Sequence, residues 1–267
     1  MASRGQAVLL VRRGDIEARP DRPVGLEAAA RGRGRLAAVV GRSLATFCVS
    51  TTESVFGLSY DDGPDPEQTS AILDVLARHC AHATFFVLAG PAAKHPEILR
   101  RMVAEGHEVA LHGLDHASLL TRSTSAAVAA VLEARAVVES IVGTSVRHYR
   151  PPYGAHTLRQ ARAIHRAGLE LVVWSGDAKD WVQADEDVII KRAWATVFPG
   201  AFLLLHDTRA DPETALDPSE LPTFDRAAVL EDLLLRATAA GYSALTVGDL
   251  MDRFPAVKSW ARERSRM

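Results

Sequence analysis

The sequence predicts an α/β fold, an irregular (β/α)7-type barrel in a single domain with an N-terminal extension. From residue 55 onwards, short apolar or β-branched runs alternate with amphipathic helical segments, which is typical of βαβ units around a parallel sheet. A chain of 267 residues with 48% hydrophobic content can bury one large core, and α/β barrels of this length are common as one domain. Five polar motifs follow predicted strands, at the end where barrel enzymes build their sites.

Seven short runs are predicted to be strands because they are apolar or alternating and are bounded by turn-forming residues. They cover residues 56–60, 83–87, 108–111, 146–149, 170–174, 201–205 and 243–247. A complete barrel of this class has about eight strands. We therefore expect one unit to be missing or irregular.

The segments between these strands have helical periodicity, and glycines close most of them, as expected for residues that adopt a left-handed conformation at a helix end. The predicted helices are 67–78, 96–105, 123–142, 157–167, 186–197 and 226–240. The closing glycines are Gly106, Gly143, Gly168 and Gly241.

Residues 1–50 are predicted to be a partly ordered N-terminal extension, and residues 51–267 the main domain. The extension is rich in arginine, has scattered Gly and Pro, and lacks a long amphipathic period. We expect one strand over 7–11 and one helix to pack on the barrel. A surface-binding arm is the alternative, and the sequence favours it less.

The overall charge limits the partners. A net charge of -2 and a pI of about 6.6 give no field that would attract nucleic acid, so no nucleic-acid partner is expected.

Cys48 and Cys80 have no metal-type spacing and are expected to be reduced thiols. The apolar run 7–11 is too short for a secretory signal, and no stretch is long enough to span a membrane. We expect a cytoplasmic protein with a soluble substrate; the oligomeric state stays open.

Three residues at predicted strand ends form a candidate metal site. Asp62, His112 and His116 offer one oxygen and two nitrogen donors, which suits a divalent metal with positions left for water and substrate. Zinc is the first choice, and cobalt, nickel and iron(II) also suit this donor set. An Asp-Gly-Pro turn alone more often caps a helix, and two histidines four apart are a weak signal alone. Their shared position at strand ends favours the metal site.

Asp61 and His206 remain to move protons. His206 ends the apolar run 201–205, and a histidine at the mouth of a buried strand can protonate a leaving amine. Arg150 precedes two prolines, which hold its backbone extended and its guanidinium in a fixed direction. Taken alone, Arg150 could equally pair with a surface acid.

Together, the five motifs resemble the NodB-like polysaccharide deacetylases, family 4 of the carbohydrate esterases, from about residue 55 to 250. They are YDDGP at 60–64, HGLDH at 112–116, RPPYG at 150–154, DAKDW at 177–181 and LLLH at 203–206. The family pattern has Ser or Thr after the first histidine of the second motif, where this chain has Gly113. A hydroxyl that helps to order the metal loop is therefore absent.

The resemblance implies that Asp62, His112 and His116 hold the metal. It also implies that Asp61 is the base that takes a proton from water, and that Arg150 pairs with Asp61 and keeps it ionised. The activity implied is metal-dependent removal of an N-acyl group, most simply acetyl, from an amino-sugar-containing oligosaccharide or glycoconjugate.

Further roles follow from the same resemblance. The backbone N–H of Tyr153 would donate to the oxyanion, and His206 would protonate the leaving nitrogen. Asp180 resembles the family's fourth motif and would orient His206, with Asp177 as the alternative partner. Trp181 and Leu204 would form the walls of the acyl and sugar pocket.

Two other functions stay open. A deformylase or cyclic-amide hydrolase would use the same site on a glycolipid head group or a small nitrogen metabolite. A carbohydrate-binding pseudoenzyme would keep the fold without turnover. Kinases, dinucleotide enzymes and serine hydrolases are excluded because phosphate-binding glycine loops and nucleophile elbows are absent.

The segment 208–224 follows the catalytic strand end and contains three prolines and four acids without an evident helix or strand. Loops of this length inside a compact domain are usually functional or disordered. We predict a wall or lid over the substrate groove, and a surface excursion is the alternative.

Overall fold

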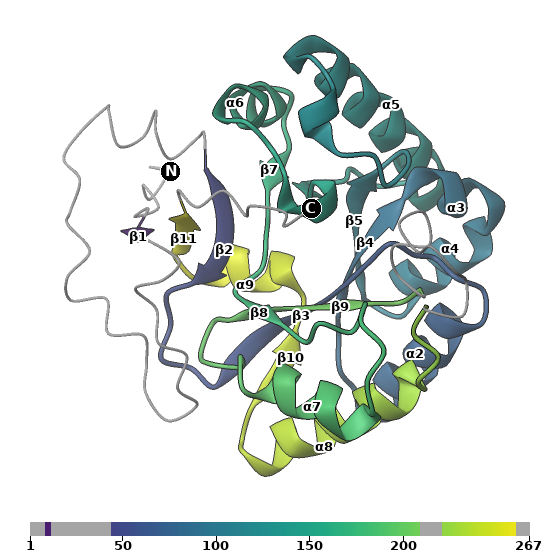
Figure 1. The fold of residues 1–267 in the computed structure, drawn as a ribbon, viewed down its shortest axis with the longest axis vertical. Coiled ribbons are helices and arrows are strands. Elements are labelled where there is room, and N and C mark those ends of the chain that lie inside the picture. Colours follow the sequence, from purple (N-terminus) through teal and green to yellow (C-terminus); the bar gives the residue numbers. More distant parts are fainter. Residues whose placement is uncertain (1–8, 12–43, 209–220, 260–267) are drawn as a thin grey trace.

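A computed structural model describes residues 9–11, 44–208 and 221–259 of the chain. The strands of its main sheet are β3 (Val55–Asp61), β4 (Thr84–Leu88), β5 (Glu108–Gly113), β6 (His148–Tyr149), β7 (Glu170–Leu171), β8 (Gly176–Asp177), β9 (Phe202–His206) and β10 (Ser243–Leu245). The strand order is β7-β6-β5-β4-β3-β9-β8, with β10 paired to β3 off that path, and every pair is parallel. The curled parallel sheet with helices around it confirms the predicted irregular (β/α)7-type barrel (Figure 1).

All six predicted helices form, with ends that differ by a few residues. The helices are α2 (Gln68–Arg78), α3 (Ala89–Lys94), α4 (Pro96–Ala104), α5 (Thr124–Val142), α6 (Leu158–Arg166), α7 (Glu186–Trp194), α8 (Arg226–Ala239) and α9 (Val247–Arg253). Helices α3 and α9 were not predicted. The predicted strand 243–247 ends early because the Thr246 side chain accepts the Asp249 N–H and starts α9.

The barrel strands separate two cores, because successive side chains on a strand point to opposite faces. One cluster of buried residues lies between the strands and the surrounding helices. A smaller cluster includes Val55, Phe86 and Phe202 from three strands and is closed by Val247 and Leu250 of α9. In β3 and β9, the last side chains on the face of this inner cluster are Asp61 and His206, which belong to the site described below.

A second sheet of three strands lies beside the barrel (Figure 1). Its strands, in the order β1-β11-β2, are β1 (Leu9–Val11), β11 (Ala256–Ser259) and β2 (Ala45–Val49). Strand β2 is buried throughout and makes single bridges to Val172 and Ala201, next to β7 and β9. The predicted boundary at residue 50 is therefore wrong for β2, which is part of the main core. The signal missed was its apolar sequence ATFCV.

The strand predicted over 170–174 is also corrected, because only Glu170 and Leu171 pair with β6 and a new two-residue strand, β8, follows. The next residue, Val172, makes a single parallel bridge to Thr46 of β2. The predicted helix in the extension and residues 209–220 of the predicted lid lie outside the described residues.

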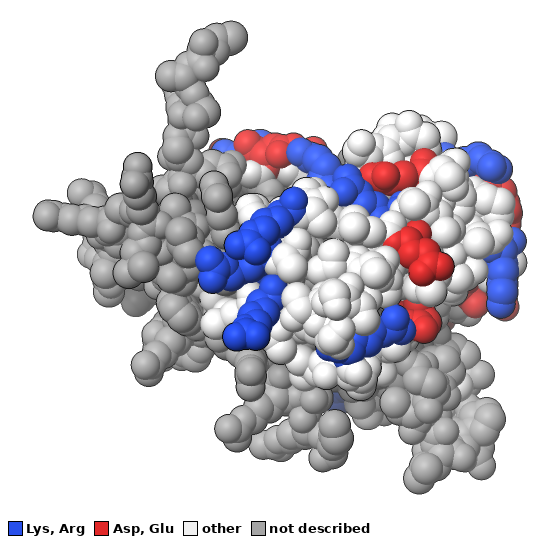
Figure 2. Space-filling view, turned by 90° about the horizontal axis from the view of Figure 1, so that it is seen from above, with Lys and Arg blue, Asp and Glu red and all other residues white. Residues whose placement is uncertain are grey.

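Within the described residues, no helix is long and apolar enough to cross a membrane. Side chains of both charge signs lie on the face shown in Figure 2, with uncharged surface between them. Cys48 is buried and Cys80 is exposed, and both are free thiols.

Candidate metal centre and active site

The predicted site residues converge at the carboxyl ends of the barrel strands. Asp61 ends β3 and is paired in register with His206, which ends β9. His112 lies near the end of β5, and Arg150 directly follows β6. Parallel strands bring these ends to one edge of the sheet, so residues far apart in the sequence become neighbours.

Asp62, His112 and His116 form the candidate metal cluster. One ligand atom from each lies within 4.8 Å of the others. Asp62 Oδ1 is 3.3 Å from Nε2 of His112 and 3.4 Å from Nε2 of His116. Asp62 is only 7% exposed, yet neither of its carboxylate oxygens makes a hydrogen bond. A buried carboxylate without donors is unfavourable unless a cation neutralises it, so this donor set fits a divalent metal.

The histidine orientations fit the same role. The Nδ1 of His112 lies 2.8 Å from the backbone carbonyl of Arg150. Because a carbonyl only accepts, Nδ1 carries the proton and Nε2 presents its lone pair to the cluster. The His116 ring packs 4.4 Å from the ring of Tyr153.

Electrostatics favour an ionised Asp62. Burial raises the pKa of Asp62, but the contact with His112 and the positive charges of His206 and His116 outweigh it. The pKa of Asp62 is therefore held well below its ordinary value, and the carboxylate stays charged and available to a cation.

Backbone strain is concentrated at this site. Four non-glycine residues of the described chain have a positive φ, and three of them, Asp62 (79°), Tyr153 (59°) and Lys179 (51°), belong to the site motifs. Such conformations cost free energy and persist where the surrounding structure enforces them, commonly at functional sites. The strain thus lies at the candidate metal ligand Asp62 and at Tyr153 beside His116.

Asp61 is fixed by Arg150. Nη1 of Arg150 donates to Asp61 Oδ1 at 2.5 Å, and the arginine side chain is fully buried. The guanidinium lies 3.9 Å from the ring centre of Phe86. The second oxygen, Asp61 Oδ2, is 3.8 Å from Nε2 of His112. Asp61 therefore lies beside the metal cluster with one oxygen held and the other directed towards it.

His206 is held by Asp180. Nδ1 of His206 lies 2.7 Å from Asp180 Oδ1, and its backbone N–H donates to Asp180 Oδ2 at 2.8 Å. Burial lowers the pKa of His206, but the charges of Asp180, Asp62 and Asp61 and the Asp180 hydrogen bond outweigh it and raise the pKa to about 10. The imidazole is thus protonated at neutral pH. Asp177 instead accepts the N–H of Lys179 at 2.7 Å, so Asp180 takes the partner role.

The residues proposed to contact substrate lie at different depths. The Trp181 ring stands perpendicular to the His206 ring, with 5.8 Å between ring centres. Tyr153 lies in the short 3-10 turn η4 (Pro152–Gly154) directly after Arg150. Leu204 is buried two residues before His206. Trp181 and Tyr153 therefore lie at the site, whereas Leu204 lies beneath it.

The metal loop depends on glycine in this chain. Gly113 has a φ of +142°, and a Cβ there would lie 3.0 Å from the carbonyl oxygen of Asp115. An L-residue with a side chain is strained in this conformation. A serine or threonine at this position, as is typical of the family, would therefore strain the loop.

Asp207 is a site residue that sequence reasoning missed. Its Oδ2 accepts the Thr69 hydroxyl at 2.7 Å, and a Cβ on Gly63 would lie 2.1 Å from that oxygen. Burial raises the pKa of Asp207 to about 7, with a further rise from Asp62. Asp207 thus packs directly against the turn that carries both aspartates. Its position directly after His206 was the only sequence signal.

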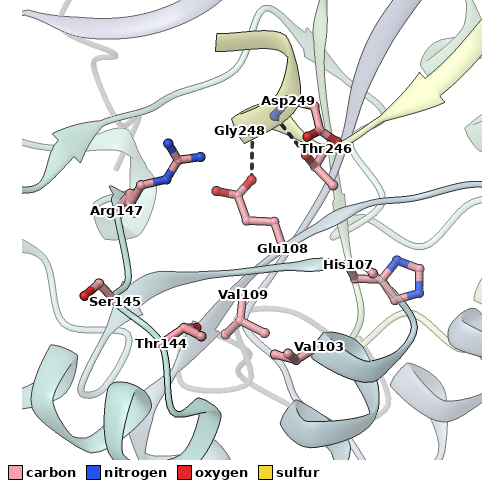
Figure 3. Close-up of a pocket in the computed structure, with 11 residues that line it drawn as sticks. Val103, His107, Glu108, Val109, Thr144, Ser145, Arg147, Thr246, Gly248 and Asp249 are labelled. Carbon is pink, nitrogen blue, oxygen red and sulfur yellow. Dashed lines mark hydrogen bonds between the residues drawn. The ribbon is translucent and has the colours of Figure 1, made fainter. Parts of the chain in front are cut away.

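A cavity of about 230 Å³ lies at the opposite end of the barrel and contains none of the predicted site residues. In Figure 3, the Glu108 carboxylate points to the first turn of α9, where it accepts the Gly248 N–H at 2.8 Å, and Arg147 lies across the cavity. Glu108 also accepts the Thr84 hydroxyl at 2.7 Å and lies 2.5 Å from Nδ1 of His148. These contacts join the beginnings of the strands to α9.

Comparisons with known proteins point to one family. Residues 49–172 match the family model described as polysaccharide deacetylase. A chitooligosaccharide deacetylase of Bradyrhizobium sp. (strain ANU 289) is 43% identical over 160 residues, which cover 60% of this chain and 73% of that protein.

More distant relatives share the same region. The peptidoglycan-N-acetylglucosamine deacetylase PgdA of Listeria monocytogenes serotype 1/2a is 31% identical over 199 residues, which cover 74% of this chain and 39% of that protein. The structure of the peptidoglycan deacetylase PdaC from Bacillus subtilis superimposes with a TM-score of 0.64 at 29% identity, over 75% of this chain and 91% of that chain. The chain therefore belongs to the polysaccharide deacetylases, the NodB-like family 4 of carbohydrate esterases, and is a hydrolase of that family.

Proposed function

We propose that this deacetylase removes the N-acetyl group from amino sugars of short chito-oligosaccharides by metal-assisted hydrolysis. The observation that carries the proposal is the buried Asp62 carboxylate, which has no hydrogen-bond donor and lies between the Nε2 atoms of His112 and His116. A proton acceptor, Asp61, and a proton donor, His206, lie in register beside it. Hydrolysis of an amide needs these functions together.

Asp62, His112 and His116 would hold the metal, and zinc is the ion we propose. When bound, the ion supplies Lewis acidity, which lowers the pKa of water and polarises a carbonyl group. The protein contributes the geometry of the ligands. Asp62 is ionised, and His112 is oriented by the Arg150 carbonyl.

The chain's own residues move the protons. Asp61, held by Arg150, accepts a proton from the attacking water on its free oxygen. His206, protonated and held by Asp180, donates a proton from Nε2 to the leaving nitrogen. The backbone N–H of Tyr153 is the proposed donor to the oxyanion, since the strained turn η4 places this residue beside His116.

The other functions are less well supported. The relatives are described as deacetylases of chitooligosaccharides and of peptidoglycan N-acetylglucosamine, which favours an N-acetylated amino sugar over a formylated lipid or a cyclic amide. A pseudoenzyme would lack one of the chemical groups of the site. Here the donor set, the base with its arginine and the histidine with its aspartate are all present.

Acetate release from N-acetylated chito-oligomers tests the proposal. Zinc-loaded protein should release acetate, and His112→Ala, prepared and loaded in the same way, should release none. A wild-type protein that contains one zinc ion and leaves every oligomer intact would contradict the substrate. The expected cytoplasmic location stays a prediction, which fractionation of the source cells would test.

A further inference from the structure

His206 is held at three atoms, and one of the residues that hold it lies outside every sequence motif. Strand β8 pairs with β9 only at Leu203 and Leu204, so it ends before it reaches His206. On that side, Asp180 accepts the His206 N–H. The His206 carbonyl accepts a hydrogen bond from Nε of Arg226 at 3.1 Å. Two side chains thus replace the strand neighbour that His206 lacks.

The opposite side of His206 is already occupied by the sheet. Asp61 and His206 are paired in register, and the Asp207 N–H donates to the Asp61 carbonyl at 3.3 Å. His206 is therefore anchored to β3 through its sheet pairing and to Asp180 and Arg226 through its own backbone. Without Arg226, the carbonyl at the very end of β9 would lose this donor.

Arg226 is built into the protein interior. It is the first residue of α8 and only 4% exposed, and its guanidinium lies 4.5 Å from the ring centre of Phe224. The positive charge of Arg226 lowers the pKa of the buried Tyr60 hydroxyl, whereas the charges of Asp180 and Asp207 raise it, so all three charges lie near that hydroxyl. A buried guanidinium is costly unless it is hydrogen-bonded and electrostatically compensated. The hydrogen bond from Nε to the His206 carbonyl offsets part of this cost.

We infer that Arg226 is a positioning residue for His206: by holding the carbonyl at the end of β9, it keeps the imidazole where Nε2 can reach the leaving nitrogen. The inference rests on the proposed role of His206 as proton donor. Proton transfer requires hydrogen-bond distance, so a small shift of the imidazole lowers turnover strongly. Arg226 acts through His206 and does not contact the substrate.

Arg226→Met tests the inference, because it keeps the apolar stem and removes the donor. Arg226→Lys keeps a donor and the charge. The matched control is Arg135→Met, because Arg135 also donates to a backbone carbonyl, that of Ala167 at 3.2 Å, far from the predicted site residues. The readouts are kcat and KM on acetylated chito-oligomers, metal content, and the proton resonance of His206 Nδ1–H, identified by its loss in His206→Gln.

In Arg226→Met, we expect kcat to fall at least ~10-fold with KM within about twofold, since misplacement of a catalytic group by about 1 Å can cost ~10²-fold. The His206 resonance should broaden or shift while the metal content stays at the wild-type value. Arg226→Lys should recover part of kcat, and Arg135→Met should leave kcat and the resonance unchanged.

Wild-type kcat with an unchanged His206 resonance in Arg226→Met would overturn the inference. A fall in kcat that occurs only together with loss of metal or of the folded state would also overturn it, because Arg226 would then be merely structural. If Arg226→Met does not fold, Arg226→Leu, which also lacks a donor, replaces it with the same readouts. A wild-type protein that releases no acetate would contradict the proposed function instead, and the resonance would still test Arg226.

Discussion

The two ends of the barrel each contain a carboxylate beside histidine, half-buried at Glu108 and buried at Asp62, and the two carboxylates have opposite surroundings. At the amino end, Glu108 is bonded by the Thr84 hydroxyl, the Gly248 N–H and the His148 imidazole. At the carboxyl end, both oxygens of Asp62 lack a hydrogen bond. Polar groups that form hydrogen bonds inside a protein stabilise the fold. A buried carboxylate without a hydrogen bond is unfavourable unless a cation neutralises it. The difference separates a structural acid from a metal ligand.

The largest effect should follow from removal of a metal ligand. His112→Ala takes away one of the two nitrogen donors, so bound metal and acetate release should both be lost. Elemental analysis of chelator-stripped and reloaded protein measures the first, and an acetate assay the second. His148→Ala at the amino end is the matched control and should retain its metal. Full metal content in His112→Ala would remove this histidine from the cluster.

A smaller effect, confined to turnover, is expected for the base. Asp61→Asn keeps the side-chain shape but cannot accept the proton of water, so kcat should fall by at least ~10²-fold, the usual size of a general-base contribution. Metal content should match the wild type because Asp61 is not a ligand. Near-normal turnover in correctly metallated Asp61→Asn would show that another group takes the proton.

The proposed proton donor, His206, should determine the alkaline limb of the pH profile of kcat. Asp180 is the largest source of the raised pKa of His206, which is about 10. In Asp180→Asn, that pKa should fall towards the ordinary imidazole value, so His206 loses its proton at lower pH and the alkaline limb of the kcat profile moves to lower pH. An alkaline limb at the wild-type position in Asp180→Asn would assign it to another group.

At the amino end, Glu108→Gln should affect stability alone. Burial raises the pKa of Glu108, but the hydrogen bonds from His148, Thr84 and Gly248 outweigh it and hold the pKa below its ordinary value. The stability that this carboxylate contributes is therefore present above the pKa of an unfolded glutamate and is lost as the pH falls through the lower folded pKa.

Denaturant unfolding at neutral pH should show a loss of about 1–3 kcal/mol for Glu108→Gln, the cost of leaving buried donors unpaired. The loss should shrink at acidic pH, where the wild-type carboxylate is itself protonated. Equal destabilisation at neutral and acidic pH, or a changed metal content, would contradict the structural role of Glu108.

An effect of similar size is expected at the metal loop. Gly113→Ser would introduce the family's hydroxyl, but φ at this position is +142° and the new Cβ would meet the Asp115 carbonyl. We expect a loss of about 1–3 kcal/mol of stability from backbone strain, and weaker metal binding. Ala117→Ser, which adds a hydroxyl in the same loop at a position that already has a Cβ, is the control. Tighter zinc binding in Gly113→Ser, measured by competition with a chelator, would show that the loop adapts to the hydroxyl.

Sequence patterns predicted the barrel because the short apolar runs of β3 and β9 and the amphipathic period of the helices are local signals. Strand β2 was not predicted because it follows an arginine-rich segment and pairs with β11, more than 200 residues later. Helix α9 was not predicted because its first turn is stabilised by Thr84 and Glu108, which are distant in sequence. Such contacts leave no pattern near the element that they stabilise.

The site residues also divide into those with a local sequence signal and those without one. The five motifs were recognisable because each joins several chemical groups at one strand end. Arg226 and Asp207 act through a backbone carbonyl and a tight turn, and neither contact has a local sequence signature. The choice between Asp177 and Asp180 needed the distance to His206, since both lie in one motif.

Zinc titration of chelator-stripped wild type, Asp62→Asn and Glu108→Gln tests the central claim most directly. We expect one zinc ion per chain for the wild type and for Glu108→Gln, and none for Asp62→Asn, because both oxygens of Asp62, unlike the carboxylate of Glu108, lack a hydrogen bond. One tightly bound zinc ion in Asp62→Asn would contradict the account.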